Sequence, residues 1–469
     1  MSLNLIKDYK KDKMFYKNLF ILTLPIVLQS LITSSLNMLD TMMIGKVGEV
    51  ELASVGIANQ YYFLFTLFVL GVAGGGGVLI AQLWGKNDKD NIKKVLSKTL
   101  AVGFIIISIF VILGLVIPGK IISIFNSDAS VVTIGSQYLT ITVISYIFTG
   151  ISFVFASSLR SIGNTKLPML ASLLGLTVNG FLNYCLIFGH FGMPELKTQG
   201  AAIATLIARI CECGLILFVV YFKDKILNIR FRDLRGLSHK LTRTLTNVTV
   251  PIVLNEATWG IGNVTYMAIY SQLGTGATAS VQICSTIMNL FMIFAFGLSY
   301  AAVVVVGNEI GANKEDVAKE SSKKIAKISV ILALFLSIIL FALARPIVSF
   351  FNISVEVKLS ATYILYVYAT ILTMRVFNMV MIVGILRGGG DATYGTMLQG
   401  CTLWLIGIPL AALGVFVFHL PVHVVVSFTA IEEIIKFIFM MRRFKSYKWI
   451  RNMVKDHDIH SKDTVSVAV

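Results

Sequence analysis

The segment LPIVLQS at residues 24–30 recurs as VPIVLNE at residues 250–256, 226 positions further along the chain. Other pairs keep the same order and nearly the same spacing: KVGEVELASVGIA at 46–58 with QLGTGATASVQIC at 272–284, AQLWGKND at 81–88 with GNEIGANK at 307–314, IISIFN at 121–126 with the last six residues of PIVSFFN at 346–352, and SLRSIGNTK at 158–166 with ILRGGGDAT at 385–393. Matches at a fixed spacing indicate that one structural unit occurs twice. The chain is therefore predicted to consist of two halves with the same fold.

Both halves are strongly apolar. Over 469 residues, 56% of the side chains are hydrophobic, 14% are charged, and the mean hydropathy is +0.82. A soluble domain carries about 25% charged residues, and a helix needs about 20 apolar residues to cross a bilayer. We therefore expect an all-α polytopic membrane protein with twelve transmembrane helices in two pseudo-symmetric six-helix bundles. The predicted spans are 18–44, 53–83, 98–118, 131–157, 168–189, 201–222, 247–271, 279–308, 325–345, 359–384, 396–418 and 421–441.

The basic residues predict the orientation of these spans. Of the 40 Lys and Arg, 31 lie in the two tails and in every second connecting segment, whereas 5 lie on the opposite side. Basic connecting segments stay in the cytoplasm, so both termini are expected there. An even number of spans in each half gives both halves the same orientation, which is a parallel repeat. Topology thus accounts for the net charge of +16, and nucleic acid is not expected as a partner.

The short motifs of the sequence exclude several classes of chemistry. The five cysteines are typical of small buried side chains rather than of a disulfide framework. No nucleotide-binding motif is present, and the glycine run at 74–77 is interpreted as a place of close helix packing. An ion gradient is therefore the expected driving force, and no enzyme activity is expected.

The predicted spans divide the chain into five parts. These are a cytoplasmic N-tail at 1–17, an N-lobe at 18–222, a basic cytoplasmic linker at 223–246 lying on lipid headgroups, a C-lobe at 247–441 and a cytoplasmic C-tail at 442–469.

Few charged side chains lie inside the predicted spans, where each costs about 2.5–3.5 kcal/mol on insertion scales. Arg209 and Glu212 are three residues apart and can neutralise one another. The two adjacent glutamates of the last span have Lys436 one turn further on, which predicts local pairing again. Arg375 has no local partner and lies near Asn378. The acidic and basic residues that the sequence places well inside spans are Asp40, Arg209, Glu212, Glu256, Arg375, Glu432 and Glu433.

Asp40 and Glu256 have no basic residue within a helical turn. Asn179 and Asn183 share one face of the fifth span, and Thr205 follows in the sixth. Carboxylate, amide and hydroxyl oxygens are ligands that small hard cations prefer, and a buried carboxylate can take up a proton because burial disfavours its charged form. The pattern thus predicts a Na⁺ or H⁺ site at Asp40, Asn179, Asn183 and Thr205. Two alternatives remain open: amides that only join helices, and an Asp40 that reaches water at its helix end.

Several of these segments resemble the multidrug and toxic compound extrusion (MATE) family of prokaryotic transporters. They are residues 24–58, AQLWGKND, SSLRSIGNTKLP, LNYCLIFG with GAAIAT, and GILRGGGDAT, and the resemblance covers about residues 18–441. It implies two six-helix lobes with a central cavity, a position in the prokaryotic plasma membrane among lipids, and alternating access. It also implies export of amphipathic, mostly cationic drugs in exchange for Na⁺ or H⁺, with no other cofactor. Each chain holds both halves of the cavity, so a monomer suffices.

The resemblance also assigns roles to single residues. Asp40 matches the acid on the first helix of the DinF-like branch, and Asn179 and Thr205 match its amide and hydroxyl. Asn183 occupies a position that is often Asp, so this chain has one charge fewer there. Glu256 is similar to the acid on the seventh helix that other branches use for coupling.

The substrate cavity is the second set of residues that the resemblance implies. Gln282 matches a glutamine that faces the cavity, and Tyr266, Met288 and Met292 would line it with adaptable apolar surface. Asn37, one turn before Asp40, completes the set. For each methionine, contact with lipid or core is an equal alternative. A second function in the same superfamily is a flippase for a lipid-linked precursor, which favours a strongly cationic cavity and often two extra helices.

Overall fold

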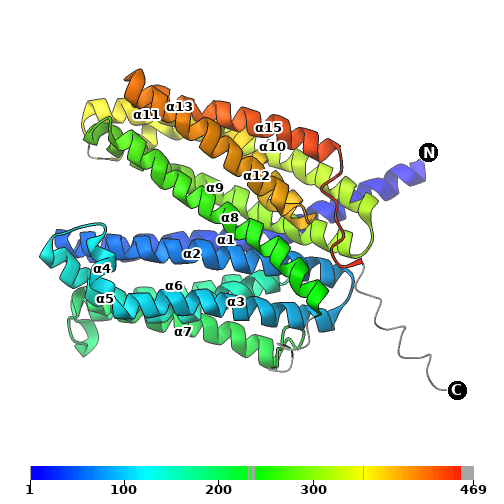
Figure 1. Cartoon of the computed structure of the whole chain (residues 1–469), viewed down its shortest axis with the longest axis horizontal. Coiled ribbons are helices and arrows are strands. Elements are labelled where there is room, and N and C mark those ends of the chain that lie inside the picture. Colours follow the sequence, from blue (N-terminus) through cyan, green and yellow to red (C-terminus); the bar gives the residue numbers. More distant parts are fainter. Residues whose placement is uncertain (1, 231–232, 234–237, 352, 456–469) are drawn as a thin grey trace. The chain divides into compact units, whose positions relative to one another are not determined.

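The computed structural model describes residues 2–230, 233, 238–351 and 353–455, with side chains from residue 12 onward, and every regular element in this part of the chain is helical (Figure 1). The predicted linker at 223–246 and the C-tail from 442 lie partly outside the described residues. In chain order the helices are α1 (Ser2–Gly45), α2 (Glu49–Gly85), α3 (Lys89–Val116), α4 (Pro118–Ser123), α5 (Ala129–Ser161), α6 (Lys166–Phe188), η1 (His190–Gly192), α7 (Lys197–Phe222), α8 (His239–Ser271), α9 (Thr275–Gly311), α10 (Glu315–Ser349), α11 (Val355–Met379), η3 (Val380–Leu386), α12 (Ala392–Thr402), η4 (Leu403–Gly407), α13 (Ile408–Ala412), η5 (Leu413–Val417), α14 (Val422–Ser427) and α15 (Thr429–Lys445).

The chain forms two compact units. The N-terminal unit is Phe20–Val253, and the C-terminal unit is Met1–Leu19 together with Leu254–Val469. Each unit is a bundle of long helices. Two helices change unit along their length, because α1 passes from one unit to the other at Leu19 and α8 does so at Val253.

The repeat predicted from the sequence is confirmed by the positions of the helices. The 37 residues of α2 and the 37 residues of α9 begin and end 226 positions apart. The starts of α3 and α10, of α5 and α11, and of α6 and α12 have the same spacing. Even the turn after α2 recurs, since Asn87 and Asn313 take up left-handed backbone conformations with φ of 62° and 59°. The two halves therefore share one fold.

Ten helical segments of the described chain are long and apolar enough to cross a membrane. They account for every predicted span except the seventh and the twelfth, which correspond to α8 and to α14 with α15. The twelfth span is not one uninterrupted helix: Phe428 N–H donates to the Val425 carbonyl over 3.1 Å, and Ile431 N–H donates to Phe428 over 3.0 Å. These i to i+3 bonds form a tight turn between α14 and α15. The tenth and eleventh spans also contain π-helical turns, at η3, η4 and η5.

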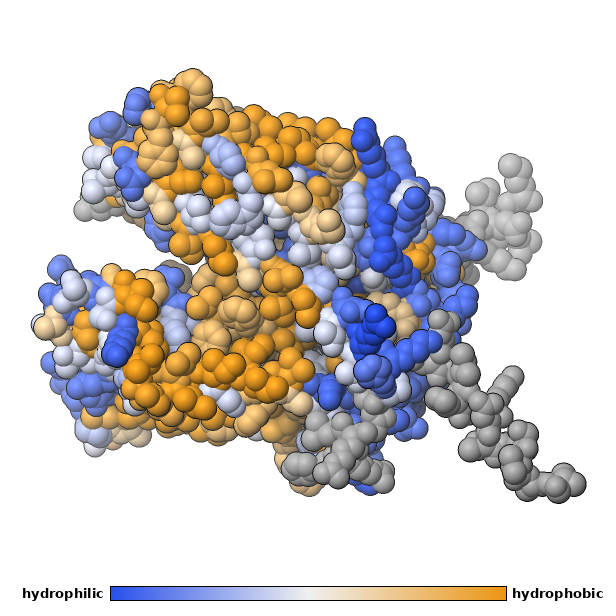
Figure 2. All heavy atoms as spheres, viewed as in Figure 1, coloured by the Kyte–Doolittle hydropathy of each residue, from blue (hydrophilic) through white to orange (hydrophobic). Residues whose placement is uncertain are grey.

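The outer faces of the long helices are apolar. Phe104, Ile105 and Ile112 on α3 are more than half exposed, as are Phe335 and Ile338 on α10. Figure 2 shows hydrophobic residues along the flanks of both units and hydrophilic residues near the helix ends. Exposed apolar surface of this extent is characteristic of contact with lipid.

The glycine run of α2 is a helix-packing surface, as predicted. A Cβ on Gly75 would lie 2.6 Å from the Cα atom of Thr249, and one on Gly71 would lie 2.7 Å from the Cα atom of Val253. Both neighbours lie on the first part of α8, which belongs to the same unit. Glycine is required here because the two backbones approach more closely than any side chain permits.

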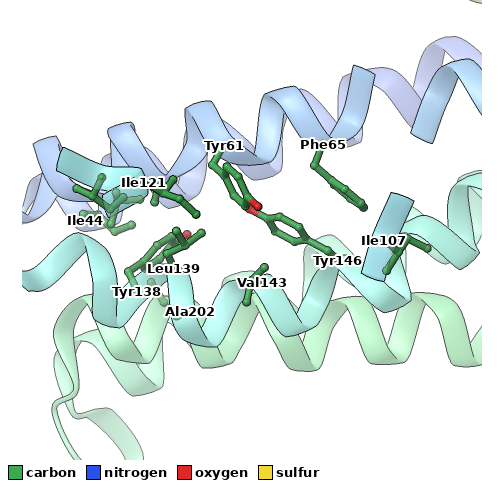
Figure 3. Packing of buried hydrophobic residues seen from close by; sticks show 14 of the residues in the cluster. Ile44, Tyr61, Phe65, Ile107, Ile121, Tyr138, Leu139, Val143, Tyr146 and Ala202 are labelled. Carbon is green, nitrogen blue, oxygen red and sulfur yellow. The ribbon is translucent and has the colours of Figure 1, made fainter. Parts of the chain in front are cut away.

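The N-terminal unit has an aromatic core beside the end of α1 (Figure 3). Phe65 of α2 stacks on Tyr146 of α5 with ring centroids 4.5 Å apart, and the Tyr61 hydroxyl donates to the Phe110 carbonyl over 2.8 Å. Ile44, in the last turn of α1, is fully buried in this cluster. The packing fixes the end of α1 against α2 and α5 and so positions Asp40, one turn before Ile44.

Candidate cation site

Four of the predicted residues meet in the N-terminal unit, on three helices. Asp40 lies on α1, Asn179 and Asn183 on α6, and Thr205 on α7. The Asn183 amide donates to Asp40 Oδ1 and also to Asn179 Oδ1, the latter over 3.0 Å. The Asn179 amide in turn donates to Thr205 Oγ1 over 3.3 Å. The structure thus joins these residues in one continuous chain of hydrogen bonds.

The amide of Asn183 is the member of this chain that is incompletely paired. Asn179 and Asn183 are both fully buried. Both N–H groups of Asn183 have acceptors, but its Oδ1 atom is buried and has no hydrogen-bond partner in the part of the chain that the structure describes. A buried acceptor without a partner is unfavourable by about 1–3 kcal/mol. This oxygen lies on the amide that contacts the Asp40 carboxylate, where a cation would satisfy it.

Asp40 forms no ion pair with any of the described residues. The positive charge of Arg209 acts on it, but Arg209 Nη1 donates to Glu212 over 2.7 Å. Glu212 also accepts a hydrogen bond from Ser172 over 2.8 Å. The predicted pairing of Arg209 with Glu212 is therefore confirmed. Because this guanidinium is held by another acid, the Asp40 carboxylate remains available to an external cation.

The alternative interpretation, in which amides only join helices, accounts for part of this geometry. Asn183 does join α6 to α1, and Asn179 joins α6 to α7. It does not account for the unpaired oxygen of Asn183 beside a carboxylate that has no cationic partner. Carboxylate, amide and hydroxyl oxygens together fit Na⁺, and a proton on Asp40 could be donated to the same amide oxygen.

Glu256, the fifth residue predicted to take part in coupling, lies in the C-terminal unit and has a partner that the local sequence did not reveal. Arg387 Nη2 lies 2.7 Å from Glu256 Oε1 and 2.7 Å from Asn255 Oδ1. Arg387 is buried, whereas the Glu256 side chain is 22% exposed. The two ends of this ion pair are 131 residues apart in the chain. Glu256 is thus neutralised within the protein.

The repeat contains the signal that could have identified Arg387. It corresponds to Arg160 in the matched segments, and Asn255 corresponds to Gln29. Arg160 Nη1 donates to Gln29 Oε1 over 3.1 Å. Both units therefore hold an arginine against an amide at equivalent positions, and the C-terminal unit adds an acid.

A second charged cluster lies in the interior of the C-terminal unit. Lys436 Nζ lies 2.9 Å from Glu432 Oε1 and 3.3 Å from Glu433 Oε1, which confirms the predicted local pairing. The Tyr266 hydroxyl donates to Glu432 over 2.8 Å, and the Asn378 amide donates to Glu433 over 2.8 Å. Sequence reasoning missed both of these links between helices.

The remaining predicted residues are spread over the two units. Arg375, whose partner the sequence left open, lies over the ring of Tyr368 at 5.8 Å and within reach of the charges on both glutamates of this cluster. It stays a prediction that a transported compound contacts the five cavity residues, which are Asn37, Tyr266, Gln282, Met288 and Met292. Asn37 is exposed on α1 and Gln282 is exposed on α9, whereas Met288 is buried and Met292 is partly exposed.

Comparison with known proteins gives consistent results. The family model MatE matches residues 25–185 and 251–413. A probable multidrug resistance protein YoeA of Bacillus subtilis is 22% identical over 413 residues, which cover 87% of this chain and 88% of that protein. A probable multidrug resistance protein NorM of Thermotoga maritima is 25% identical over 435 residues, which cover 90% of each chain.

Solved structures show the same fold. A crystal structure of MATE in complex with MaL6 superimposes with a TM-score of 0.84 at 19% identity and covers 92% of this chain and 97% of that one. An outward-facing conformation of a multidrug resistance MATE family transporter of the MOP superfamily gives 0.82 at 19% identity, with 92% and 96% covered. At this level of identity the likeness establishes the fold.

Proposed function

This chain belongs to the MATE (MatE) family of membrane transporters, and on that premise we propose that it exports amphipathic, mostly cationic compounds in exchange for Na⁺ or H⁺. The family is one of transporters and not of enzymes, and this member is a multi-pass membrane protein. The names of its relatives, which describe probable multidrug resistance proteins, support drugs as substrates. The proposal includes alternating access, both termini in the cytoplasm, and a monomer as the working unit.

Asp40 is the residue that we assign to coupling. Of the five acids that the sequence places well inside spans, Glu212, Glu256, Glu432 and Glu433 each form an ion pair within the protein. Asp40 does not, among the described residues. An unpaired acid at membrane depth is a functional candidate by default because its charged form is costly there. This contrast is the observation that carries the proposal.

The neighbours of Asp40 indicate how either ion would be held. Na⁺ would be bound by the carboxylate, the free Oδ1 of Asn183 and the hydroxyl of Thr205. H⁺ would reside on the carboxyl group and be donated to the same Oδ1. In both cases the incoming cation removes the negative charge of Asp40 and satisfies a buried acceptor. When the cation leaves, Asp40 is charged again and the buried oxygen of Asn183 is again without a partner. The transport cycle can therefore alternate between a cation-bound and a cation-free state.

Ethidium efflux from loaded proteoliposomes tests this function. Wild-type protein is assayed under an imposed Na⁺ gradient and, separately, under a pH gradient. Efflux driven by Na⁺ alone identifies a sodium site, and efflux driven by pH alone identifies a proton carrier. If neither gradient drives efflux, the exporter proposal fails and the flippase for a lipid-linked precursor takes its place.

A further inference from the structure

Two lysines lie over the ring of Tyr447, just beyond the end of α15. Lys319 Nζ and Lys323 Nζ, one turn apart on α10, each lie 5.6 Å from the centroid of the Tyr447 ring. Two like charges at this spacing on one helix repel each other. Lys319 is paired with Asp316 over 2.9 Å, whereas Lys323 has no acidic partner among the described residues. The positive charge at the ring is thus only partly compensated.

Further cations follow in the adjoining chain. Arg442, Lys445 and Lys448 are exposed, and the described part of the chain gives none of them an ion pair. Arg443 is different, because it turns inward and binds the buried Asp391 over 2.7 Å. Figure 2 shows hydrophilic residues gathered at the end of the C-terminal unit where α10 begins and α15 ends. We call Lys319, Lys323, Arg442, Lys445 and Lys448, with Tyr447, the basic patch.

Each helix that leads into the basic patch has an exposed apolar face. On α15, Ile431, Ile434 and Ile438 are all more than 40% exposed and lie at helical spacing before Arg442. On α10, Ile331, Leu334, Phe335 and Ile338 are at least half exposed and follow Lys323 along the helix. An anionic lipid fits such a surface, because its acyl chains can lie along the apolar helix faces while its phosphate binds the cations of the basic patch.

The segment that carries Tyr447 is anchored to the rest of the C-terminal unit. Trp449 is fully buried, and its indole donates to the Phe444 carbonyl over 3.1 Å. The Arg451 N–H donates to the Gly389 carbonyl over 2.8 Å, and Arg451 also pairs with Asp391 at 3.0 Å. A Cβ on Gly390 would lie 2.8 Å from the Arg451 carbonyl oxygen, so glycine is needed for this approach. These contacts anchor the backbone beside Tyr447, so a smaller part of the site has to become ordered when a ligand binds.

The described residues of the N-terminal unit show no equivalent pair of lysines. Lys93 lies 226 residues before Lys319, at the matching position of α3. The position of Lys323 is taken by Ser97, which is buried. The patch therefore differs from the general excess of basic residues that sets membrane orientation.

We propose that the basic patch binds the phosphate of an anionic phospholipid whose acyl chains lie along α10 and α15. The predicted orientation places the patch at the cytoplasmic leaflet. A bound phosphate would neutralise the lysines at Tyr447 and strengthen the attachment of the C-terminal segment to Gly389 and Asp391. This inference does not rest on the proposed function.

Native mass spectrometry of the full-length protein, titrated with phosphatidylglycerol or phosphatidylcholine, tests the site. We expect wild type to retain phosphatidylglycerol preferentially, and K319Q/K323Q to bind it about tenfold more weakly. The matched control K93Q/K94Q removes the same charge from the N-terminal unit and should bind like wild type. K319R/K323R, which keeps the charges, should also bind like wild type.

Thermal unfolding in detergent gives a second readout. Phosphatidylglycerol should raise the midpoint of wild type and of K93Q/K94Q, and should have little effect on K319Q/K323Q. Equal weakening in the two glutamine variants would show that only overall charge attracts the lipid and would overturn the proposal. Unchanged lipid binding in K319Q/K323Q, or the same rise with inorganic phosphate alone, would overturn it as well.

Discussion

Asp40 in the N-terminal unit and Glu256 in the C-terminal unit look alike in the sequence, since each is an acid inside a predicted span without a basic neighbour. Their surroundings differ. Glu256 is 2.7 Å from Arg387, whereas Asp40 accepts a hydrogen bond from the Asn183 amide, whose own oxygen has no partner in the described part of the chain. The repeat retains the fold and the contact of an arginine with an amide in both units. The acids differ: Glu256 is paired with Arg387, whereas Asp40 has no cationic partner among the described residues, because Arg209 of its unit is paired with Glu212.

The largest effect is expected from D40N, which removes the charge and keeps the shape. Efflux driven by either gradient should fall to the level of protein-free vesicles, because no group remains to hold the coupling ion. Thermal unfolding and membrane insertion should stay close to wild type. Gradient-driven efflux by a well-folded D40N would show that coupling resides elsewhere. The difference in pairing between Asp40 and Glu256 would then not explain coupling.

A gain is expected from N183D, which places a second carboxylate at the unpaired oxygen. For a sodium site, the concentration of Na⁺ that gives half-maximal efflux should fall about tenfold, which corresponds to about 1.4 kcal/mol of tighter binding. N183L, which removes the oxygen, should raise that concentration. If Asn183 only joins helices, both variants will lose stability and neither will alter the dependence of efflux on Na⁺.

E256Q is expected to lower stability and to reduce efflux only in part. It leaves Arg387 buried without its carboxylate, which should lower the free energy of unfolding by about 1–3 kcal/mol. The double variant E256Q/R387Q should recover part of this loss, because the charge without a partner is then absent. Loss of all gradient-driven efflux in E256Q, with normal folding, would assign coupling to the C-terminal unit.

The smallest effect is expected from Y266F. It removes one hydrogen bond to Glu432, which keeps Lys436 as its partner, so the free energy of unfolding should fall by about 0.5–1.5 kcal/mol. The dependence of efflux on the ion gradient should not change. A changed ion dependence would mean that this cluster of the C-terminal unit also takes part in coupling.

Much of the fold could be predicted because it depends on repeated and periodic features. The spacing of 226 residues between LPIVLQS and VPIVLNE reappears in the starts of four pairs of helices. The tight turn at Phe428 could not be predicted, because no glycine or proline marks the change there.

The candidate site was predictable where residues share one helix face. Asn179 and Asn183 are four residues apart on α6, and a chain of hydrogen bonds joins them to Asp40 and Thr205. The pairing of Glu256 was not visible locally, because its partner lies 131 residues away and only the repeat indicates it. The unpaired oxygen of Asn183 depends on which acceptors its N–H groups find in the folded chain, which spacing alone does not determine.

The most direct test measures the coupling ion itself. Proteoliposomes loaded with ethidium are diluted into ethidium-free buffer, and the inward movement of ²²Na⁺ or H⁺ that accompanies ethidium efflux is recorded for wild type, D40N and E256Q/R387Q. The account predicts ion uptake by wild type and by E256Q/R387Q, and none by D40N. Ion uptake that persists in D40N and disappears in E256Q/R387Q would contradict it.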